Sequence, residues 1–322
     1  MRWLNQLRVL ANRIVNFVRH HRLKTQYRRP FWGATSIVLI AIIFLLVHGE
    51  SGSSTSQHPT AEKQPQNIAT QVTDLATVKI QTRLRAYLKR VATTQDVSVT
   101  FYNLAPVAGS SAAKDTTDGL NTPGTVTASI HGNKKRTASD LDKLYIAAYL
   151  SHQKKLTWSA NDLSGFETMM IHNSDRYGDS ILNRYGKVTL NRYLKTLKLK
   201  AVFSYVQPSQ TTSNNVASML RRLADQKAPF TNAKRRRMIL SDMGQQVFRT
   251  GIPAGINSIL PEAKIQDVIG YSGTVNNDAA IVTTKDGQRF VLVIMTKGAM
   301  QQDFEVIGDI ANRVTEIVYF KG

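Results

Sequence analysis

The chain of 322 residues contains no cysteine, which excludes disulfide bonds, thiolate-bound metal sites and a cysteine nucleophile. Its seven histidines show no H-E-x-x-H or comparable spacing, and no glycine-rich phosphate loop is present, so the sequence predicts no metal site and no cofactor. Acidic residues are scarce as well. Against 42 lysines and arginines stand 22 acidic residues, and the formal net charge of +20 favours anionic partners.

Positive charge is concentrated at the start of the chain. Residues 1–30 contain eight arginines and lysines and no acidic residue, and their apolar residues recur at helical spacing. We expect this basic segment to be cytoplasmic. There it either lies on anionic lipid or acts only as a topology signal. Nucleic acid is not an expected partner.

An uncharged apolar run, FWGATSIVLIAIIFLLV, follows at residues 31–47, and Trp32 stands near its start. We predict one transmembrane helix over residues 31–48. A cleaved signal peptide is the alternative, but its charged region would be long and VHGESGSS is a poor cleavage site. The positive-inside rule then predicts a single-pass protein of the cell membrane with a cytoplasmic N-terminus and an extracellular C-terminal domain. Residues 49–72, rich in Ser, Thr, Gln and Pro, predict a flexible extracellular linker.

Residues 73–322 have the patterning of a globular domain. Residues 74–92 have helical periodicity, residues 96–104 and 125–130 alternate like strands, and residues 141–150 read as a buried helix. More helices follow, then a hairpin over residues 279–298 with its turn at 285–287, and a final helix. This order predicts an α+β fold, in which terminal helices flank an antiparallel sheet built from both ends of the domain, beside an all-helical half.

This layout, together with several short strings, resembles class A β-lactamases and related penicillin-binding serine hydrolases. The resemblance covers residues 74–322 and rests on LDKLYIAAYL, HNSDRYGDSILNRYG, TTSNNVASMLRRL, FRTGIPAGI and, above all, VIGYSGTVNNDAAIVTTKDGQRFVLVIMTKG. It implies a serine acyl-transfer site built from the motifs Ser-x-x-Lys, Ser-Asp-Asn and Lys-Thr/Ser-Gly. In class A β-lactamases a glutamate also activates the deacylating water.

The first motif is altered at the nucleophile. Lys143 fits the lysine, but Asp140 occupies the nucleophile position three residues earlier. An ion pair between them would remove the use of Lys143 as a base, although Asp140 could also simply cap a helix. Ser139 is a tentative nucleophile four residues before Lys143, which requires a rewound or bulged helix start. The alternative is that Ser139 is a helix cap.

The other two motifs are altered where they would touch substrate. Ser174 and Asp175 match the second motif, but Arg176 replaces the amide-binding asparagine. The third motif is read as Tyr271-Ser272-Gly273, with tyrosine in place of the carboxylate-attracting lysine. The backbone N–H groups of Thr274 and residue 140 are the expected oxyanion donors. The segment AVFSYVQPSQ, which precedes TTSNNVASML, contains no acid for deacylation.

We therefore expect a catalytically impaired, membrane-anchored protein that binds peptidoglycan or another cell-wall partner. Two alternatives remain. One is an active hydrolase of β-lactams or peptidoglycan peptides, with Ser139 as nucleophile, Lys143 as base and Ser174 as proton relay. The other is a structural or regulatory factor with a vestigial cleft. Basic runs at residues 134–136, 154–155 and 234–237 are either solvated surface or attract anionic wall polymers.

Overall fold

The computed structural model describes residues 64–153, 157–298 and 300–320, without the side chains of residues 64–74. The predicted segments 1–30 and 31–48 lie outside these residues. Within the described ranges, no helix is long and apolar enough to cross a bilayer. The first described helix, α3 (Gln64–Thr94), begins earlier than expected. Residues 64–72, which we expected to be flexible linker, are its first turns, and Pro65 stands near the helix start where proline is tolerated.

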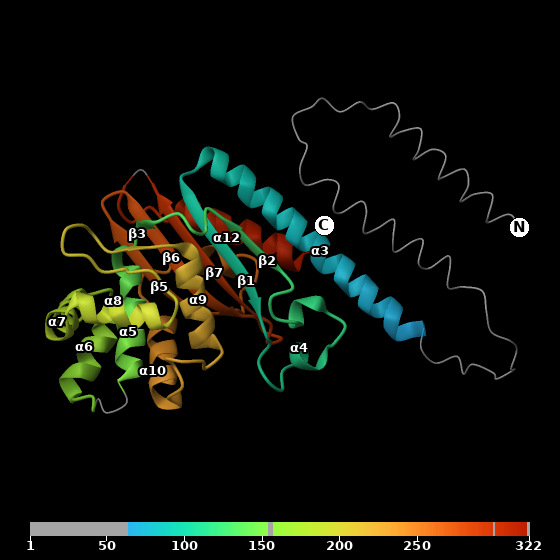
Figure 1. Cartoon of the computed structure of the whole chain (residues 1–322). Helices are drawn as coiled ribbons and strands as arrows, with labels where there is room; N and C mark the ends of the chain where they lie inside the picture. Colours follow the sequence, from blue (N-terminus) through green and yellow to red (C-terminus); the bar gives the residue numbers. More distant parts are fainter. Residues whose placement is uncertain (1–63, 154–156, 299, 321–322) are drawn as a thin grey trace, which may run out of the picture. The chain divides into compact units, whose positions relative to one another are not determined.

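A five-stranded antiparallel sheet forms the middle of the domain (Figure 1), in the order β2-β1-β7-β6-β5. Its strands are β1 (Val97–Leu104), β2 (Thr127–Ile130), β5 (Lys264–Ser272), β6 (Val275–Thr283) and β7 (Arg289–Lys297). A separate pair consists of β3 (Arg136–Thr137) and β4 (Gln210–Thr211). The predicted hairpin is the β6–β7 pair, with Thr283 opposite Arg289.

Helices cover both faces of this sheet. The terminal helices α3 and α12 (Glu305–Tyr319) lie on one face with α11 (Ile252–Asn257). The helical half on the other face consists of α5 (Lys143–His152), α6 (Ala160–Ile171), α7 (Arg176–Tyr185), α8 (Lys187–Thr196), α9 (Ser213–Ala224) and α10 (Ala233–Gly244). Short turns α4 (Ser111–Lys114), η1 (Gly119–Asn121) and η2 (Ser139–Asp142) complete the described elements. The expected α+β fold is therefore present.

The strand sequences reflect this double covering. Along β7, Val291 and Val293 face the helical half, while Leu292 and Ile294 face the terminal helices. Successive side chains of a strand point to opposite faces, so a central strand covered on both sides is apolar throughout. The seven residues between the two ends of β7 are all buried.

The helix α5 runs through the helical half and is apolar on all sides. Its residues from Lys143 to Ser151 are buried, as expected for a helix packed among other elements. The short helix η2 leads directly into α5 and packs against β5 and β6. Lys143, the first residue of α5, is thereby fixed at the junction between the helical half and the sheet.

Candidate functional site

A cavity of about 260 Å³ opens at this junction. Its walls come from η2 and the start of α5, from α7, from the loop before β4, and from the end of β5. The lining residues are Thr137, Ser139, Asp140, Asp142, Lys143, Ile146, Asp175, Gly178, Asp179, Leu182, Pro208, Ser209, Tyr271 and Ser272. The fold thus brings most of the predicted site residues to one place. Ser174, Arg176, Gly273 and Thr274 are not among them.

Lys143 is the centre of the site, and its side chain is only 3% exposed. Its Nζ lies 3.1 Å from Asp140 Oδ1 and 2.9 Å from Asp175 Oδ1. It also donates to the backbone oxygen of Asn173 at 2.6 Å and to Asn173 Oδ1 at 3.0 Å. An ammonium has three N–H donors, and four oxygens here compete for them. Lys143 is therefore an ion-pair partner of both carboxyl groups and a hydrogen-bond donor to Asn173.

The Asp140 carboxyl group is bonded on both oxygens. Oδ1 faces Lys143, and Oδ2 accepts from Asn173 Nδ2 at 2.8 Å and from the Tyr271 N–H at 3.3 Å. Burial raises the pKa of Asp140 in spite of the nearby Lys143 charge. For Asp175 the hydrogen bond and charge of Lys143 outweigh desolvation and lower the pKa. The two neighbouring carboxyl groups therefore have pKa values shifted in opposite directions.

Ser139 lines the cavity, but its hydroxyl is not presented to it. The Oγ atom is buried and has no hydrogen-bond partner among the described residues. The backbone of Ser139 has a φ of +46°, an uncommon left-handed conformation for serine, and this turns Asp140 toward Lys143. Neither helix-cap expectation is met. Ala138 is the cap residue of η2 and Asp142 that of α5, and neither makes a side-chain cap bond.

The second motif lies one residue earlier than the sequence suggested. Asn173 and Asp175 contact Lys143, whereas Ser174 and Arg176 flank them outside the cavity lining. Asn173 has a φ of +57°, which asparagine tolerates better than most residues, and this turns both its carbonyl and its amide toward Lys143. The arrangement at the site is therefore Asn173-Ser174-Asp175, and no hydrogen bond joins Ser174 to Lys143 within the described residues.

The third motif is also displaced, toward the N-terminus of β5. At Gly270 a Cβ atom would lie 2.8 Å from the backbone nitrogens of Asp140 and Leu141. Gly273, the glycine of the predicted third motif, has a φ of +56° in the β5–β6 turn and open space around it. If Gly270 is taken as the glycine of the third motif, the three residues of that motif are Val268, Ile269 and Gly270. The side chains of Val268 and Ile269 are both buried. No lysine stands on this strand beside the cavity.

Tyr271 contributes its backbone to the site. Its ring packs edge-on against Phe248 and Phe304, at centroid distances of 5.6 and 6.5 Å. Its N–H faces Asp140, so this group, rather than the Thr274 N–H, is the strand donor next to the nucleophile position. Thr274 belongs to the turn, where its carbonyl accepts from the Gly298 N–H at 2.7 Å. The Tyr271 N–H is therefore bonded to the Asp140 carboxyl group, and the Thr274 carbonyl is bonded within the turn.

Comparison with known proteins identifies the family and the fold. The profile of the Beta-lactamase enzyme family matches residues 149–318, which include Asp175 and Tyr271 but begin after Lys143. The chain belongs to the beta-lactamase enzyme family. No curated protein matches this family member.

Solved structures resemble this β-lactamase family member in fold. PBP-A is 18% identical with a TM-score of 0.59, covering 74% of this chain and 96% of PBP-A. A PBP-A mutant, described as an acyl-enzyme complex with penicillin G, is 19% identical with a TM-score of 0.57, covering 74% and 96%. A beta-lactamase from Xanthomonas campestris is 16% identical with a TM-score of 0.57, covering 75% and 99%.

The cavity of this family member is acidic. Four aspartates line it, and Lys143 is its single basic residue. Burial raises the pKa of Asp142 to about 7, against the opposing effect of a hydrogen bond from Ser209. The sequence analysis missed Asn173, Gly270, Asp142 and Asp179. Asparagine is a residue type that tolerates a left-handed turn, and glycine is one that permits a close backbone approach, so Asn173 and Gly270 could have been noted as candidates. Only the tertiary packing shows which residues meet Lys143.

In two of the basic runs, at residues 134–136 and 234–237, side chains form salt bridges or hydrogen bonds within the domain. Lys134 and Arg136 pair with Asp96 at 2.9 and 2.6 Å, and these bonds lower the pKa of Asp96. Arg235 donates to the Gln153 carbonyl at 2.8 Å, and Arg236 donates to the Leu223 and Ala224 carbonyls at 2.6 and 2.7 Å. Residues 154–155 lie outside the described residues. Among the residues that the structure describes, no group of three or more His, Cys, Asp or Glu could hold a metal ion.

The close approach at Gly270 leads to a stability prediction. We expect Gly270→Ala to lower the free energy of unfolding by about 2 kcal/mol, because the added methyl group meets backbone atoms that cannot rotate away. Gly244→Ala is the matched control: its Cβ would lie 3.8 Å from its nearest neighbour, Gln266 Cγ, and should change stability by less than about 0.5 kcal/mol. Urea unfolding of both variants measures this. Equal midpoints would refute the tight contact between β5 and η2.

Proposed function

We propose that this chain is a membrane-anchored extracellular member of the β-lactamase family that binds a cell-wall ligand in its cleft without forming an acyl-enzyme. The observation that carries the proposal is the state of Lys143, which is bound by Asp140, Asp175 and Asn173. The anchoring rests on the apolar run at residues 31–48 and the basic residues before it.

Acyl transfer needs a nucleophile, a base and an open oxyanion hole, and each is compromised here. An adduct on the Asp140 carboxylate would be a mixed anhydride, which water hydrolyses readily. The Ser139 hydroxyl is buried, so a substrate carbonyl cannot reach it in this conformation. The Tyr271 N–H is taken by Asp140. The geometry thus supports binding in place of covalent catalysis.

The lining of the cleft indicates which part of a ligand it would hold. Penicillins and the C-termini of wall peptides present a carboxylate, but Lys143 is the single basic residue of the cavity lining and is already paired with two aspartates. Asp175 and Asp179 are exposed at the cavity and carry negative charge toward solvent. An amine attracted by these carboxylates is the better match. We propose that the ligand is a peptidoglycan peptide, or a wall-associated partner, that presents a free amine.

Incubation of the full-length chain with fluorescent penicillin, followed by intact-mass measurement, tests the absence of acylation. We expect no adduct on either the unaltered chain or Ser139→Ala. A stoichiometric adduct that disappears in Ser139→Ala would establish the active hydrolase in place of this proposal. For binding, we expect a wall peptide with a free amine to bind several-fold more tightly than its N-acetylated form, and Asp179→Asn to remove the difference. Equal binding of both peptides would refute the amine preference.

A further inference from the structure

The helix α3 packs on the domain with one side only. Its buried residues recur at helical spacing, at Thr77, Ile80, Leu84 and Leu88, and the helix contacts β1, β2, η1 and α12. In Figure 1, α3 runs along the outside of the sheet, and its first turns extend past the strands. The side of α3 opposite the buried residues therefore faces solvent.

The solvent-facing side of α3 is a continuous stripe along the helix. Successive residues are rotated by about 100°, which places a second set of residues opposite the buried ones. We refer to this set as the outer face, and all of its residues are exposed: Leu75, Lys79, Thr82, Arg83, Ala86, Lys89, Arg90 and Thr93. From Lys79 to Thr93 the outer face extends about 21 Å along the helix axis. Small ligands occupy concave pockets, whereas a convex surface of this length suits an extended partner.

The outer face carries charge of one sign. Four of its residues are lysine or arginine, and the last acidic residue of α3 is Asp74, before the outer face begins. No salt bridge within the described residues involves Lys79, Lys89 or Arg90. Acidic side chains adjoin α3 on the flank toward α12, where burial, followed by the charge of Asp309, raises the pKa of Tyr87. The outer face itself is therefore complementary to an anionic surface.

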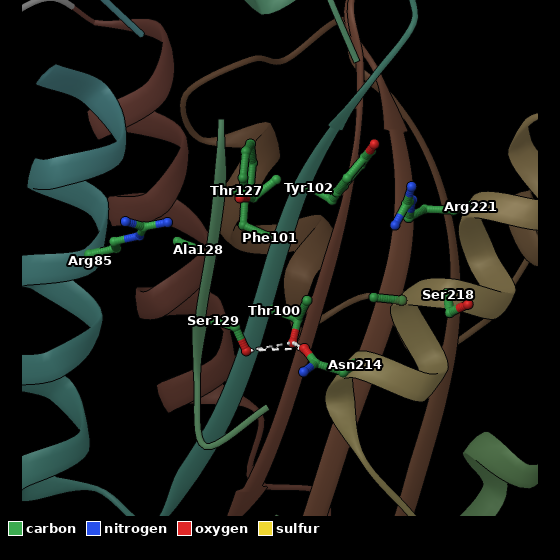
Figure 2. A pocket seen from close by; sticks show the side chains of 11 residues that line it. Arg85, Thr100, Phe101, Tyr102, Thr127, Ala128, Ser129, Asn214, Ser218 and Arg221 are labelled. Atoms are coloured by element: carbon green, nitrogen blue, oxygen red, sulfur yellow. Dashed lines mark hydrogen bonds between the residues drawn. The ribbon is translucent and has the colours of Figure 1, made fainter. Parts of the chain in front are cut away.

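Arg85, a fifth basic residue of α3, does not belong to the outer face. Figure 2 shows it on the flank toward β2, where it lines a cavity of about 520 Å³ together with Thr127 and Ser129. The other basic residue of that cavity, Arg221, belongs to α9 and lies beyond β2 and β1 (Figure 2). The two arginines are thus separated by the sheet, and the outer face is the continuous basic surface of this helix.

The chain before α3 indicates which anionic surface is within reach. The proposed membrane span ends at residue 48, and α3 begins at Gln64. Even when fully extended, residues 49–63 bridge at most roughly 50 Å. The outer face is thus confined to the neighbourhood of the bilayer, and this tether gives the lipid headgroups a high effective concentration that a dissolved polyanion lacks.

We propose that the outer face of α3 binds the anionic headgroups of the bilayer that anchors the chain. This inference rests on the membrane anchor of the proposed function. Lysines and arginines near an anionic membrane are attracted to it, and salt weakens the attraction. Leu75 and Val78 are 63% and 57% exposed and stand at the end of α3 that follows the anchor in the chain. Apolar side chains beside basic ones suit the boundary between headgroups and acyl chains.

A fluorescent label on the outer face tests this proposal in the full-length chain. The chain contains no cysteine, so Thr82→Cys provides a single attachment point on the outer face. The labelled chain is placed in lipid nanodiscs of phosphatidylcholine, with or without phosphatidylglycerol, in which a nitroxide on some phosphatidylcholine headgroups quenches a nearby label. We expect quenching to be at least about threefold stronger with phosphatidylglycerol, and high salt to remove the difference. The same label at Thr196→Cys, at the exposed end of α8 in the helical half, should be quenched equally weakly in both lipids.

Two variants with the same loss of charge distinguish the outer face from general attraction of a basic domain. We expect Lys79→Gln/Lys89→Gln/Arg90→Gln to reduce the quenching at position 82 to the level seen in phosphatidylcholine alone. Arg192→Gln/Lys195→Gln/Lys200→Gln removes three charges from exposed positions of the helical half and should change the quenching by less than about twofold. Equal losses in both variants would overturn the assignment of the outer face.

The remaining outcomes separate this inference from the anchor on which it rests. Failure of the full-length chain to co-purify with nanodiscs would refute the membrane anchor and this inference with it. Co-purification with equal quenching at position 82 in both lipids would refute this inference alone. If that result were accompanied by a fluorescence shift of the label on addition of polyglycerol phosphate, the outer face would instead be a binding surface for a wall polymer.

Discussion

The double variant Asp140→Ser/Asp175→Asn is expected to form a covalent adduct with penicillin, whereas the unaltered chain and Asp140→Ser alone form none. The single substitution restores a hydroxyl three residues before Lys143 but leaves the ammonium paired with Asp175 at 2.9 Å. The second substitution replaces that carboxylate with an amide of the same shape. Lys143 then has lost both of its salt-bridge partners and can accept the proton of the introduced serine.

The same double variant also opens the oxyanion hole. The carboxyl oxygen that now accepts the Tyr271 N–H at 3.3 Å is removed with Asp140, so this donor is free for a substrate carbonyl. We expect the adduct to persist for hours, because residues 201–210 contain no acid to activate a deacylating water. Intact-mass measurement after incubation with penicillin follows both its formation and its loss.

Two controls define the outcome of this experiment. Adding Ser139→Ala to the double variant should leave the adduct unchanged, because the Ser139 hydroxyl is buried and takes no part. Adding Lys143→Met should abolish it, because the base is lost. Acylation of Asp140→Ser at the rate of the double variant would show that Asp175 does not restrain Lys143.

Removal of the central cation is expected to have the largest effect on stability. We predict that Lys143→Met lowers the free energy of unfolding by roughly 3 kcal/mol at pH 7, because it leaves the buried carboxyl of Asp140 without its ionic partner. The contribution of Asp175 is small, since its side chain is 70% exposed and solvent screens its charge. Chemical unfolding of the full-length chain measures the loss.

The pH dependence distinguishes a lost ion pair from a packing defect. Burial already raises the pKa of Asp140, and without Lys143 it rises further. When the pKa of a carboxyl group is higher in the folded chain than in the unfolded chain, its contribution to the free energy of unfolding is fully present below the unfolded-state pKa. That contribution is lost as the pH rises through the folded-state pKa. The deficit of Lys143→Met should therefore shrink between pH 7 and pH 4, and Asp140→Asn added to it should restore much of the stability at pH 7. A deficit independent of pH would instead indicate poor packing of the methionine.

The fold was readable from the sequence, because it depends on periodicity. Alternation at residues 96–104, the apolar run at residues 141–150 and the 285–287 turn each predicted an element of the structure. The positions of the motifs were less readable. Of the matched pairs Ser174-Asp175 and Ser272-Gly273, only Asp175 and Ser272 line the cavity, while packing also brings Asn173 to Lys143 and Gly270 against η2.

The reason for these shifts lies in the backbone. Asn173 meets Lys143 because a left-handed residue turns the chain between α6 and α7, and no periodic pattern reports such a turn. Gly270 matters because η2, far away in the sequence, lies against β5 there. The choice between Ser139 and Asp140 likewise depends on one left-handed φ angle. Each is a tertiary effect on a single residue.

The run at residues 234–237 has a consequence for how binding experiments on this protein are interpreted. Arg235 donates to the Leu150 carbonyl near the end of α5, and Arg236 donates to the Ala224 carbonyl at the end of α9. Alanine or charge-reversal scanning of this run would remove these bonds from both helix ends, so any loss of ligand binding could follow from the damaged helices without either arginine touching a ligand. Only Lys234 and Arg237 can be neutralised as a measure of long-range attraction, because no hydrogen bond or salt bridge within the described residues involves their side chains.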